Sequence, residues 1–451
     1  MLLPPARALS LALLARSCAA EWVQDRFAIS FWVDPQVPEQ DVDARFAEIA
    51  GANFTAHLGF NSGPNPYPPN PARVAAQLAA AAKHNLKSIP SICENCASPE
   101  SCGVPYHSGG TCRDLKSEAL WGYQLADEPS ATLFPALRNW TQSIAAANPD
   151  ALRFINLLPA CAGEKLSGVK GLPMTYDEYV GNFTLVVRPQ VLSMDSYPIF
   201  GQAEASIDQR IYRSNLATMR RHSLAAGIGF WSFFNCVPYS NHFDPTPAQL
   251  RWQALTALAY GAKGVLWYYY WSPYFAGTAG GGIILPTLNT TDPLLSARSY
   301  RPRPHYGHAR TLNSLLKIYG GFLLNATSTG VYYVPDTSNV TATVQALQGC
   351  TVLAGIRSVA LVNAKGKYLV GEFVLPEGEK AMLLQNQDDE HVLWSTVVFH
   401  PAAPQPHVQE VDPIHGGLRP LVDDSPWMDG ISSGSNLAAR ACSFCRSWST
   451  R

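Results

Sequence analysis

A chain of 451 residues that is 47% hydrophobic and 15% charged is long enough for one large globular domain and a smaller second one. Its formal net charge is −1 and it contains no long basic or acidic run, so the sequence offers no electrostatic basis for binding nucleic acid. The same balance favours a ligand that is not strongly charged.

Residues 1–20 have the pattern of a secretory signal peptide. MLLPPAR carries a positive charge, ALSLALLA is a short apolar run, and the small residues Cys18, Ala19 and Ala20 suit cleavage before Glu21. The run is too short to span a bilayer, and later apolar runs are broken by Gly, Pro or a charge, so we expect no membrane span. We therefore predict a protein that is secreted or resides in the secretory lumen, with an unstructured cytosolic N-terminus as the alternative.

Cysteines and glycosylation sequons agree with secretion. Four cysteines crowd a loop rich in Pro, Ser and Gly, which favours two local disulfides over a zinc site because their spacing is irregular: Cys93, Cys96, Cys102 and Cys112. Asn-x-Ser/Thr sequons occur at Asn53, Asn139, Asn182, Asn289, Asn325 and Asn339.

Between residue 27 and about residue 323, short apolar stretches alternate with amphipathic helical segments. The expected strands are 27–34, 53–60, 86–93, 122–129, 152–159, 191–198, 228–235 and 264–271. Strands that alternate with helices predict a parallel sheet, and eight such units are the count of a (β/α)8 TIM barrel, here over residues 21–328. A doubly wound open sheet is the alternative, but the glycine fingerprint of a dinucleotide site is absent, so no cofactor is expected.

After about residue 328 the sequence pattern no longer alternates between strands and helices. Residues 329–400 are rich in short β-prone runs separated by turn residues, which predicts a small antiparallel, sandwich-like accessory domain. Residues 401–451 are rich in Pro, Ser, Gly and Asp, and we expect an irregular or disordered tail. The Cys442-x-x-Cys445 pair in this tail is not expected to have a redox role.

Alternation of side chains within the strands indicates which face points to the barrel axis. In the first, second, fourth and sixth strands, large apolar residues share one parity and small or polar residues share the other. We assign the polar parity to the axis. It includes Trp32, His57 and Tyr197, and it ends at the carboxyl ends of the strands with Asp34, Asn61, Glu128 and Asp195.

Active sites of these barrels lie at the carboxyl ends of the strands, where "LADEPS" places two adjacent acids. Parity directs Glu128 inward and Asp127 toward neighbouring backbone, and Pro129 ends the strand. An acid here could instead cap the next helix, but Ser130 suits that role better. Glu128 is therefore a candidate catalytic residue.

"YQLADEP" resembles the acid/base strand of the (β/α)8 glycoside hydrolase clan, in which Asn-Glu-Pro is usual. "INLLPAC", "YDEYVGNF", "VLSMDSYPIF" and "RWQALTALAYGAKGVLWYYYW" also resemble the barrel of β-galactosidase-like hydrolases of the family 42 type. The resemblance covers about residues 27 to 400, including the accessory sandwich. It implies a secreted glycosidase that acts on a carbohydrate, with Glu128 as the proton donor.

The chain departs from that pattern in two places. Asp127 stands where the clan has Asn, and the seventh strand, "GFWSFFNC", has no acid where the clan has its nucleophile. The best second carboxylate is Asp195, which could equally bond Tyr197 or loop backbone, and Asp34 is a weaker choice. Because the fourth and sixth strands are not neighbours, we expect Glu128 and Asp195 to leave room for a water, which favours inversion of configuration.

The remaining candidates concern the bound sugar. Aromatic rings pack on the C–H faces of sugars, and amide or imidazole groups bind hydroxyls, although about half of the aromatic residues are expected in the core. The candidates are Trp32, His57, Asn61, Asp127, Asn156, Tyr197, Trp231, Asn235, Trp267 and Asp34. A catalytically silent carbohydrate-binding barrel is the rival reading. A metal-dependent hydrolase is disfavoured because the first strand has no His-x-His.

Overall fold

The computed structural model describes residues 22–59, 71–91, 117–200, 209–272, 282–286, 300–335, 345–349, 356–361, 367–387, 393–399, 407–420, 432–437 and 442–448. The expected signal peptide, the loop with four cysteines, Asn61, and the sequons at Asn289 and Asn339 lie outside these ranges. No helix in the described ranges has the length and apolar character needed to cross a membrane.

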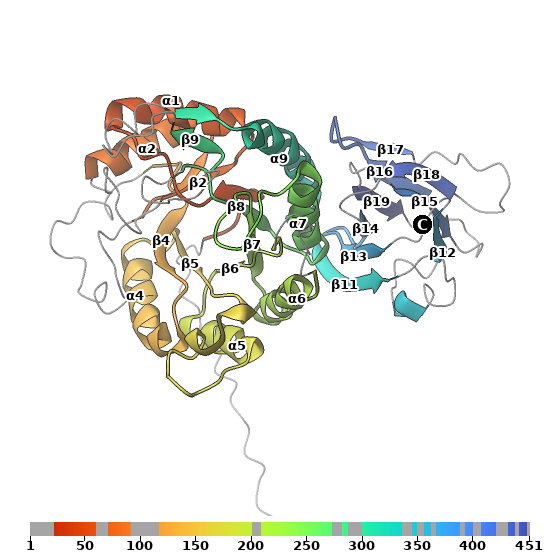
Figure 1. The fold of residues 1–451 in the computed structure, drawn as a ribbon, viewed down its shortest axis with the longest axis horizontal. Helices are drawn as coiled ribbons and strands as arrows, with labels where there is room; N and C mark the ends of the chain where they lie inside the picture. The colour runs from red at the N-terminus through yellow and green to blue at the C-terminus, as the bar shows by residue number, and fades with distance from the viewer. Residues whose placement is uncertain are drawn as a thin grey trace, which may run out of the picture.

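Eight parallel strands occupy the first part of the chain, each inside the range expected for it. They are β1 (Ala28–Phe31), β2 (Ala56–Leu58), β3 (Lys87–Ile89), β4 (Gly122–Asp127), β5 (Leu152–Asn156), β6 (Val191–Asp195), β7 (Gly229–Asn235) and β8 (Gly264–Tyr268). Helices lie around them, as Figure 1 shows: α1 (Val42–Gly51), α2 (Pro71–Lys83), α4 (Phe134–Ala147), α5 (Tyr176–Val187), α6 (Gln209–Ala226), α7 (Pro247–Ala259) and α9 (Pro304–Leu323).

The strands pair with their neighbours in chain order. Parallel ladders form the orders β1-β8-β7-β6, β2-β3 and β4-β5. Backbone hydrogen bonds link the remaining neighbours: Thr55 N–H donates to Ile29 between β2 and β1, Gln124 to Pro90 between β4 and β3, and Leu157 to Ser193 between β5 and β6. The predicted α/β class with parallel strands is therefore confirmed.

The ends of two helices are set by the local sequence. Thr175 and Glu178 form a capping box at the start of α5, and Thr246 and Gln249 form another at the start of α7. From Leu250 to Ala259 every residue of α7 except Arg251 is buried, unlike in an ordinary surface helix, because strands β13 (Tyr368–Val374) and β14 (Lys380–Asn386) of the C-terminal sheet pack against it. Gln385 fastens this contact by donating to the carbonyl of Trp252 at 2.9 Å.

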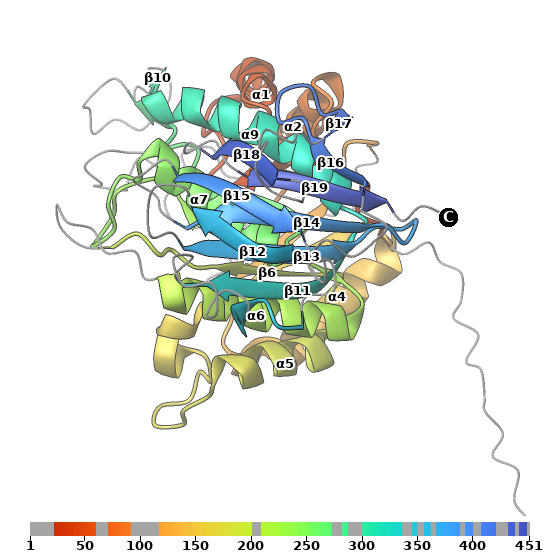
Figure 2. The ribbon, with the colours of Figure 1, turned by 90° about the vertical axis from the view of Figure 1, so that its right-hand side faces the viewer.

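The C-terminal part is antiparallel (Figure 2). A six-stranded sheet has the order β11-β13-β14-β19-β16-β17, and a three-stranded sheet has the order β12-β15-β18. Their bounds are β11 (Thr327–Val334), β12 (Ile356–Leu361), β13 (Tyr368–Val374), β14 (Lys380–Asn386), β15 (Leu393–Phe399), β16 (His407–Val411), β17 (Leu418–Pro420), β18 (Ser432–Leu437) and β19 (Cys442–Trp448). A short hairpin of β9 (Ile284–Pro286) and β10 (Tyr300–Pro302) follows β8.

The expectation of an irregular tail after residue 401 is wrong. Strand β19 lies between β14 and β16 and pairs with both, and β18 is the third strand of the smaller sheet. Serine and glycine in these strands weaken the local β signal, and pairing with strands that are distant in the sequence supplies the missing stabilisation.

Candidate active site

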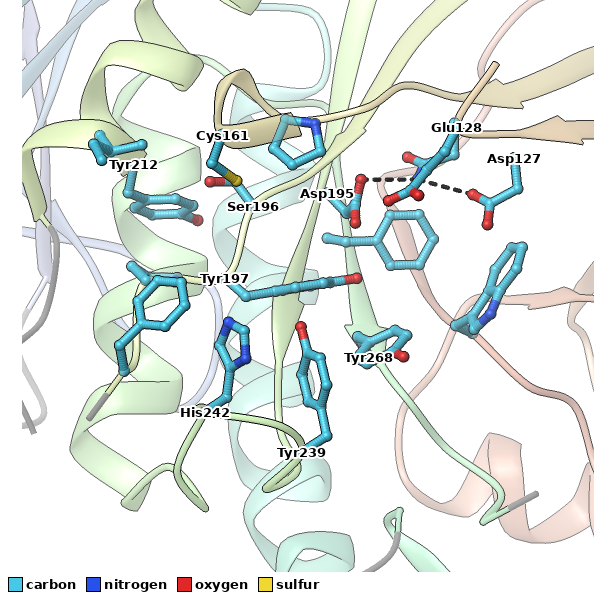
Figure 3. A pocket seen from close by; sticks show the side chains of 17 residues that line it. Asp127, Glu128, Cys161, Asp195, Ser196, Tyr197, Tyr212, Tyr239, His242 and Tyr268 are labelled. Atoms are coloured by element: carbon cyan, nitrogen blue, oxygen red, sulfur yellow. Dashed lines mark hydrogen bonds between the residues drawn. The ribbon is translucent and has the colours of Figure 1, made fainter. Parts of the chain in front are cut away.

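A pocket of about 530 Å³ opens at the carboxyl ends of the strands. The ends of β1, β4, β5, β6, β7 and β8 all contribute to its wall, together with the loops that follow β5, β6 and β7. Figure 3 shows the carboxyl groups of Asp127, Glu128 and Asp195 side by side in this pocket, with aromatic rings such as those of Tyr197, Tyr239 and Tyr268 next to them. This is the face of a strand–helix fold where side chains from many strands converge.

Both acids at the end of β4 reach the pocket, which corrects the expected outward direction of Asp127. The ladder between β4 and β5 skips Leu125, and this bulge places Asp127 opposite Asn156. Glu128 then adopts a left-handed conformation with φ of 49°. Its N–H donates to the Asn156 carbonyl at 2.9 Å, and the Tyr179 hydroxyl donates to the Pro129 carbonyl at 2.5 Å.

Asn156 connects Asp127 with Asp195 on β6. Its Nδ2 donates to Oδ1 of Asp127 at 3.2 Å and to Oδ1 of Asp195 at 3.3 Å. Its Oδ1 accepts from the Ser193 hydroxyl at 3.0 Å. The two N–H bonds of an amide diverge by about 120°, which for ideal bonds separates the two carboxylate oxygens by roughly 5–6 Å.

Glu128 and Asp195 are close enough to interact. The charge of Glu128 contributes, after burial, to the raised pKa of the Asp195 carboxyl, and Figure 3 shows the two carboxyl groups side by side. The bulge in β4 and the left-handed backbone at Glu128 turn its side chain toward β6. The spacing expected for an inverting pair stays a prediction.

The electrostatics of the site favour protonated carboxyl groups. Burial, then the charges of Glu128 and Asp127, raise the pKa of Asp195 well above its ordinary value. Desolvation among the surrounding protein atoms, then the charge of Glu128, raise the pKa of Asp127 to about 7, and the hydrogen bond from Asn156 opposes this rise. Asp127 and Glu128 still face water through the pocket mouth, whereas Asp195 is only 7% exposed, so the desolvation is deepest at Asp195.

Aromatic rings form the wall opposite the carboxyl groups. Tyr197 stacks on Tyr268 with ring centres 4.8 Å apart, and Tyr239 meets Tyr268 edge-on at 5.2 Å. His242 stacks on Tyr239 at 4.3 Å. Sequence reasoning missed Tyr239 and His242, although "VPYSNHF" directly after the seventh strand offers a Tyr and a His at the functional end of the fold. Trp32 also lines the pocket, as predicted from parity.

Asp34 and His57 do not line the pocket, contrary to the expected substrate-binding role. Val33 has φ of 60°, which breaks the strand alternation and turns Asp34 toward α2. There Oδ2 of Asp34 accepts from Gln77 at 2.7 Å and faces Arg73 at 3.7 Å. Nε2 of His57 lies 3.4 Å from the same oxygen, and its ring packs on that of Phe46 in α1. Asp34 and His57 therefore belong to a buried polar cluster between the strands and the helices α1 and α2.

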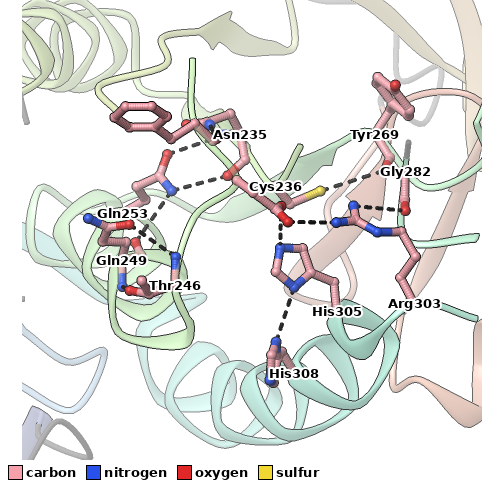
Figure 4. A network of polar contacts seen from close by, with 12 residues as sticks. Asn235, Cys236, Thr246, Gln249, Gln253, Tyr269, Gly282, Arg303, His305 and His308 are labelled. Atoms are coloured by element: carbon pink, nitrogen blue, oxygen red, sulfur yellow. Dashed lines mark hydrogen bonds and ion pairs between the residues drawn. The ribbon is translucent and has the colours of Figure 1, made fainter. Parts of the chain in front are cut away.

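Three further candidates are also structural. Trp231 is fully buried, stacks on Trp121 and donates to Gln24 at 3.1 Å. Trp267 points outward and donates to Asn313 of α9 at 3.0 Å. Asn235 is joined through its backbone to the Gln253 side chain of α7, as Figure 4 shows, because strand β7 delivers Phe233 rather than Asn235 to the pocket.

In the part of the chain that the structure describes, no three His, Cys, Asp or Glu side chains are grouped so that they could hold a metal ion. Cys161 at the pocket and the buried Cys236 are not in disulfides.

Neither a family model nor a curated protein sequence matches this chain. Among solved structures, an endo-β-1,4-mannanase from Thermotoga petrophila is similar at 11% identity over 85% of this chain and 98% of its own, with a TM-score of 0.42. A β-galactosidase from Halorubrum lacusprofundi is similar at 12% identity over 64% and 58%, with a TM-score of 0.43. These likenesses are too distant to carry an argument about activity, and the family 42 type is not shown.

Proposed function

We propose that the protein is a (β/α)8-barrel glycoside hydrolase that cleaves O-glycosidic bonds of an uncharged oligo- or polysaccharide. The observation that carries the proposal is the gathering of Asp127, Glu128 and Asp195 in one pocket opposite an aromatic wall. The sequence of ladders and hydrogen bonds from β1 round to β8 supports a closed barrel with this pocket at its carboxyl end.

Glycoside hydrolysis needs a protonated acid at the leaving oxygen and an ionised carboxylate at the anomeric carbon. In our proposal Glu128 and Asp195 share one proton, which lies on Asp195 at rest because its burial, and then the charges of Glu128 and Asp127, disfavour its ionisation. Glu128, the more accessible of the two, accepts this proton from Asp195 and delivers it to the leaving oxygen as the C–O bond breaks.

Asp127 is the proposed nucleophile, a role that replaces the clan's missing acid on the seventh strand. Asp127 lies in the same pocket as Glu128, and the amide of Asn156 holds its carboxylate by a hydrogen bond of 3.2 Å. Attack by Asp127 forms a glycosyl ester, and Glu128 then takes a proton from the water that hydrolyses this ester, which restores the shared proton. The product therefore retains its configuration.

A panel of neutral 4-nitrophenyl glycosides of both anomeric configurations tests the proposal, with product configuration followed by proton NMR. Glu128→Gln should lose turnover on poor leaving groups but much less on dinitrophenyl glycosides, which depart without acid assistance. Asp127→Ala should lose turnover on all of them and regain it with azide, which replaces the carboxylate as the nucleophile. Glu118→Gln, an exposed glutamate near the other end of β4, is the control and should keep full activity.

A catalytically silent carbohydrate-binding barrel is the second candidate, because β7 presents Phe233 to the pocket instead of an acid. The same panel separates the two functions. A silent barrel binds neutral oligosaccharides in calorimetry with the wild type and with Glu128→Gln alike, and cleaves no glycoside.

We also propose that the protein is secreted. The N-terminal pattern and the exposed sequons at Asn139, Asn182 and Asn325 support this localisation. Expression of the full chain in a eukaryotic secretory cell tests it. The protein should appear in the medium and lose mass on treatment with peptide N-glycosidase, whereas retention in the cytosol without glycans would refute it.

A further inference from the structure

Every polar atom of the Asn156 side chain has a partner inside the protein. Both N–H bonds of Nδ2 are directed at carboxylate oxygens, those of Asp127 and Asp195, and Oδ1 accepts from Ser193. Asn156 is 3% exposed, and Ser193 is fully buried. The amide therefore has no free N–H with which to bind a sugar hydroxyl, which is the role expected of Asn156 from the sequence.

We propose that Asn156 is a positioning residue that sets the distance between Asp127 and the Glu128–Asp195 pair, and that Ser193 fixes the orientation of its amide. This inference rests on the proposed function, since the distance matters for catalysis only if the carboxyl groups act on a glycoside. Without the amide, Asp127 and Asp195 would lose a group that donates a hydrogen bond to both of them, and no other described residue does so.

Ser193 can orient the Asn156 side chain because an amide has a donor end, Nδ2, and an acceptor end, Oδ1. A rotated Asn156 would present Oδ1 to two carboxyl groups, an arrangement that is repulsive unless both are protonated. The Ser193 hydroxyl donates to Oδ1 from the opposite side and so stabilises the orientation in which the N–H bonds face the acids. Ser193 lies on β6 two residues before Asp195, so one strand carries both an acid and the group that orients the amide.

The electrostatic consequence gives a measurable signature. A hydrogen bond donated to an ionised carboxylate stabilises the charge, and the bond from Asn156 accordingly lowers the pKa of Asp127. Removing this donor must move the titration of Asp127 to higher pH. A residue that only binds substrate or only fills space does not produce that shift.

The test uses Asn156→Ala and the milder Ser193→Ala in the full chain, with Ser30→Ala as the matched control. Ser30 is also fully buried on a barrel strand, and its hydroxyl has no hydrogen-bond partner among the described residues. We expect kcat on neutral 4-nitrophenyl glycosides to fall roughly ten- to hundredfold in the first two variants, as for a misplaced reacting group, with little change in KM. The acidic limb of the rate profile should move to higher pH, and Ser30→Ala should change neither quantity.

A second readout does not depend on turnover. Carbon-13 NMR of γ-labelled aspartate, assigned with Asp127→Asn and Asp195→Asn, reports the titration of each carboxyl group in the free protein. Titration of Asp127 at higher pH in Asn156→Ala supports the inference even if no glycoside is cleaved, in which case only the proposed function fails. Unchanged titration, or a rise in KM with kcat and the pH profile unchanged, overturns the inference and returns Asn156 to sugar binding.

Discussion

Arg73 compensates the buried charge of Asp34 between the strands and α2. We predict how much the free energy of unfolding falls when Arg73 is replaced. Arg73 and Asp34 are 2% and 3% exposed, and their charged groups lie 3.7 Å apart. Arg73 also donates to the carbonyls of Pro35, at 2.6 Å, and Val37. The Arg73→Met variant keeps an unbranched apolar stem but lacks the guanidinium, and among the described residues it leaves the Asp34 carboxylate with Gln77 and His57 as partners.

The expected loss follows from two limits. Removing one partner of a buried ion pair costs about 3–5 kcal/mol. The variant can instead protonate the carboxyl group, which removes the buried charge. At pH 7 this costs about 4 kcal/mol for an ordinary aspartate that titrates near 3.9, so the loss in stability should not exceed this value by much. We therefore expect a loss of about 4 kcal/mol at pH 7.

The sign of the pH dependence is fixed by the same reasoning. An acid that is protonated in the folded variant and ionised in its unfolded chain loses stability as pH rises, so lowering the pH from 7 to 5 should recover about 2.7 kcal/mol. Urea unfolding followed by circular dichroism at both pH values measures the change.

The double variant Asp34→Asn, Arg73→Met is the control, because it removes both charges together. It should regain most of the lost stability. A loss below about 1 kcal/mol for Arg73→Met at pH 7, or an equal loss at pH 5 and pH 7, would show that the Asp34 charge is not what Arg73 compensates.

Three further outcomes are expected at the pocket. The kcat/KM of the wild type should fall below a midpoint near pH 7, because Asp127, whose pKa is about 7, must be ionised to attack; a rate independent of pH between 6 and 8 would contradict this. Tyr179→Phe releases the Pro129 carbonyl and should lower kcat without raising KM, since Glu128 loses its support; steady-state kinetics separates the two constants. Tyr197→Ala removes one ring of the aromatic wall and should weaken binding of a neutral oligosaccharide about tenfold in calorimetry, while Tyr197→Phe retains it.

The strand–helix order could be predicted from the sequence because it depends on long, repeated patterns. Each of the strands β1–β8 falls within its expected range, since buried parallel strands are short apolar runs between amphipathic helices. Strands such as β19 were missed because their stability comes from pairing with β14 and β16 rather than from their own composition.

The site itself was only partly predictable, and the errors have a common physical origin. The alternation of side chains correctly predicted that Trp32 and Asp195 point into the pocket. Strand β6 is regular as far as Asp195, and β1 is regular as far as Phe31, the residue before Trp32. It failed for Asp127 at a bulge and for Asp34 after a residue with positive φ. Neither Leu125 nor Val33 is a glycine or an asparagine, so no residue type signalled the change of direction.

Glu128 is the residue whose backbone conformation was hardest to predict, because Pro129 after it favours a different one. A residue before proline favours an extended conformation, yet Glu128 has φ of 49° ahead of Pro129. Such a conformation costs about 1–3 kcal/mol and persists only where surrounding bonds hold it. Here the Glu128 N–H bonds to Asn156, and Tyr179 holds the Pro129 carbonyl, so contacts from β5 and α5 outweigh the local preference. An extended Glu128 would continue the direction of β4. The left-handed one turns its carboxyl to Asp195, and the proton transfer that we propose between these two residues depends on that turn.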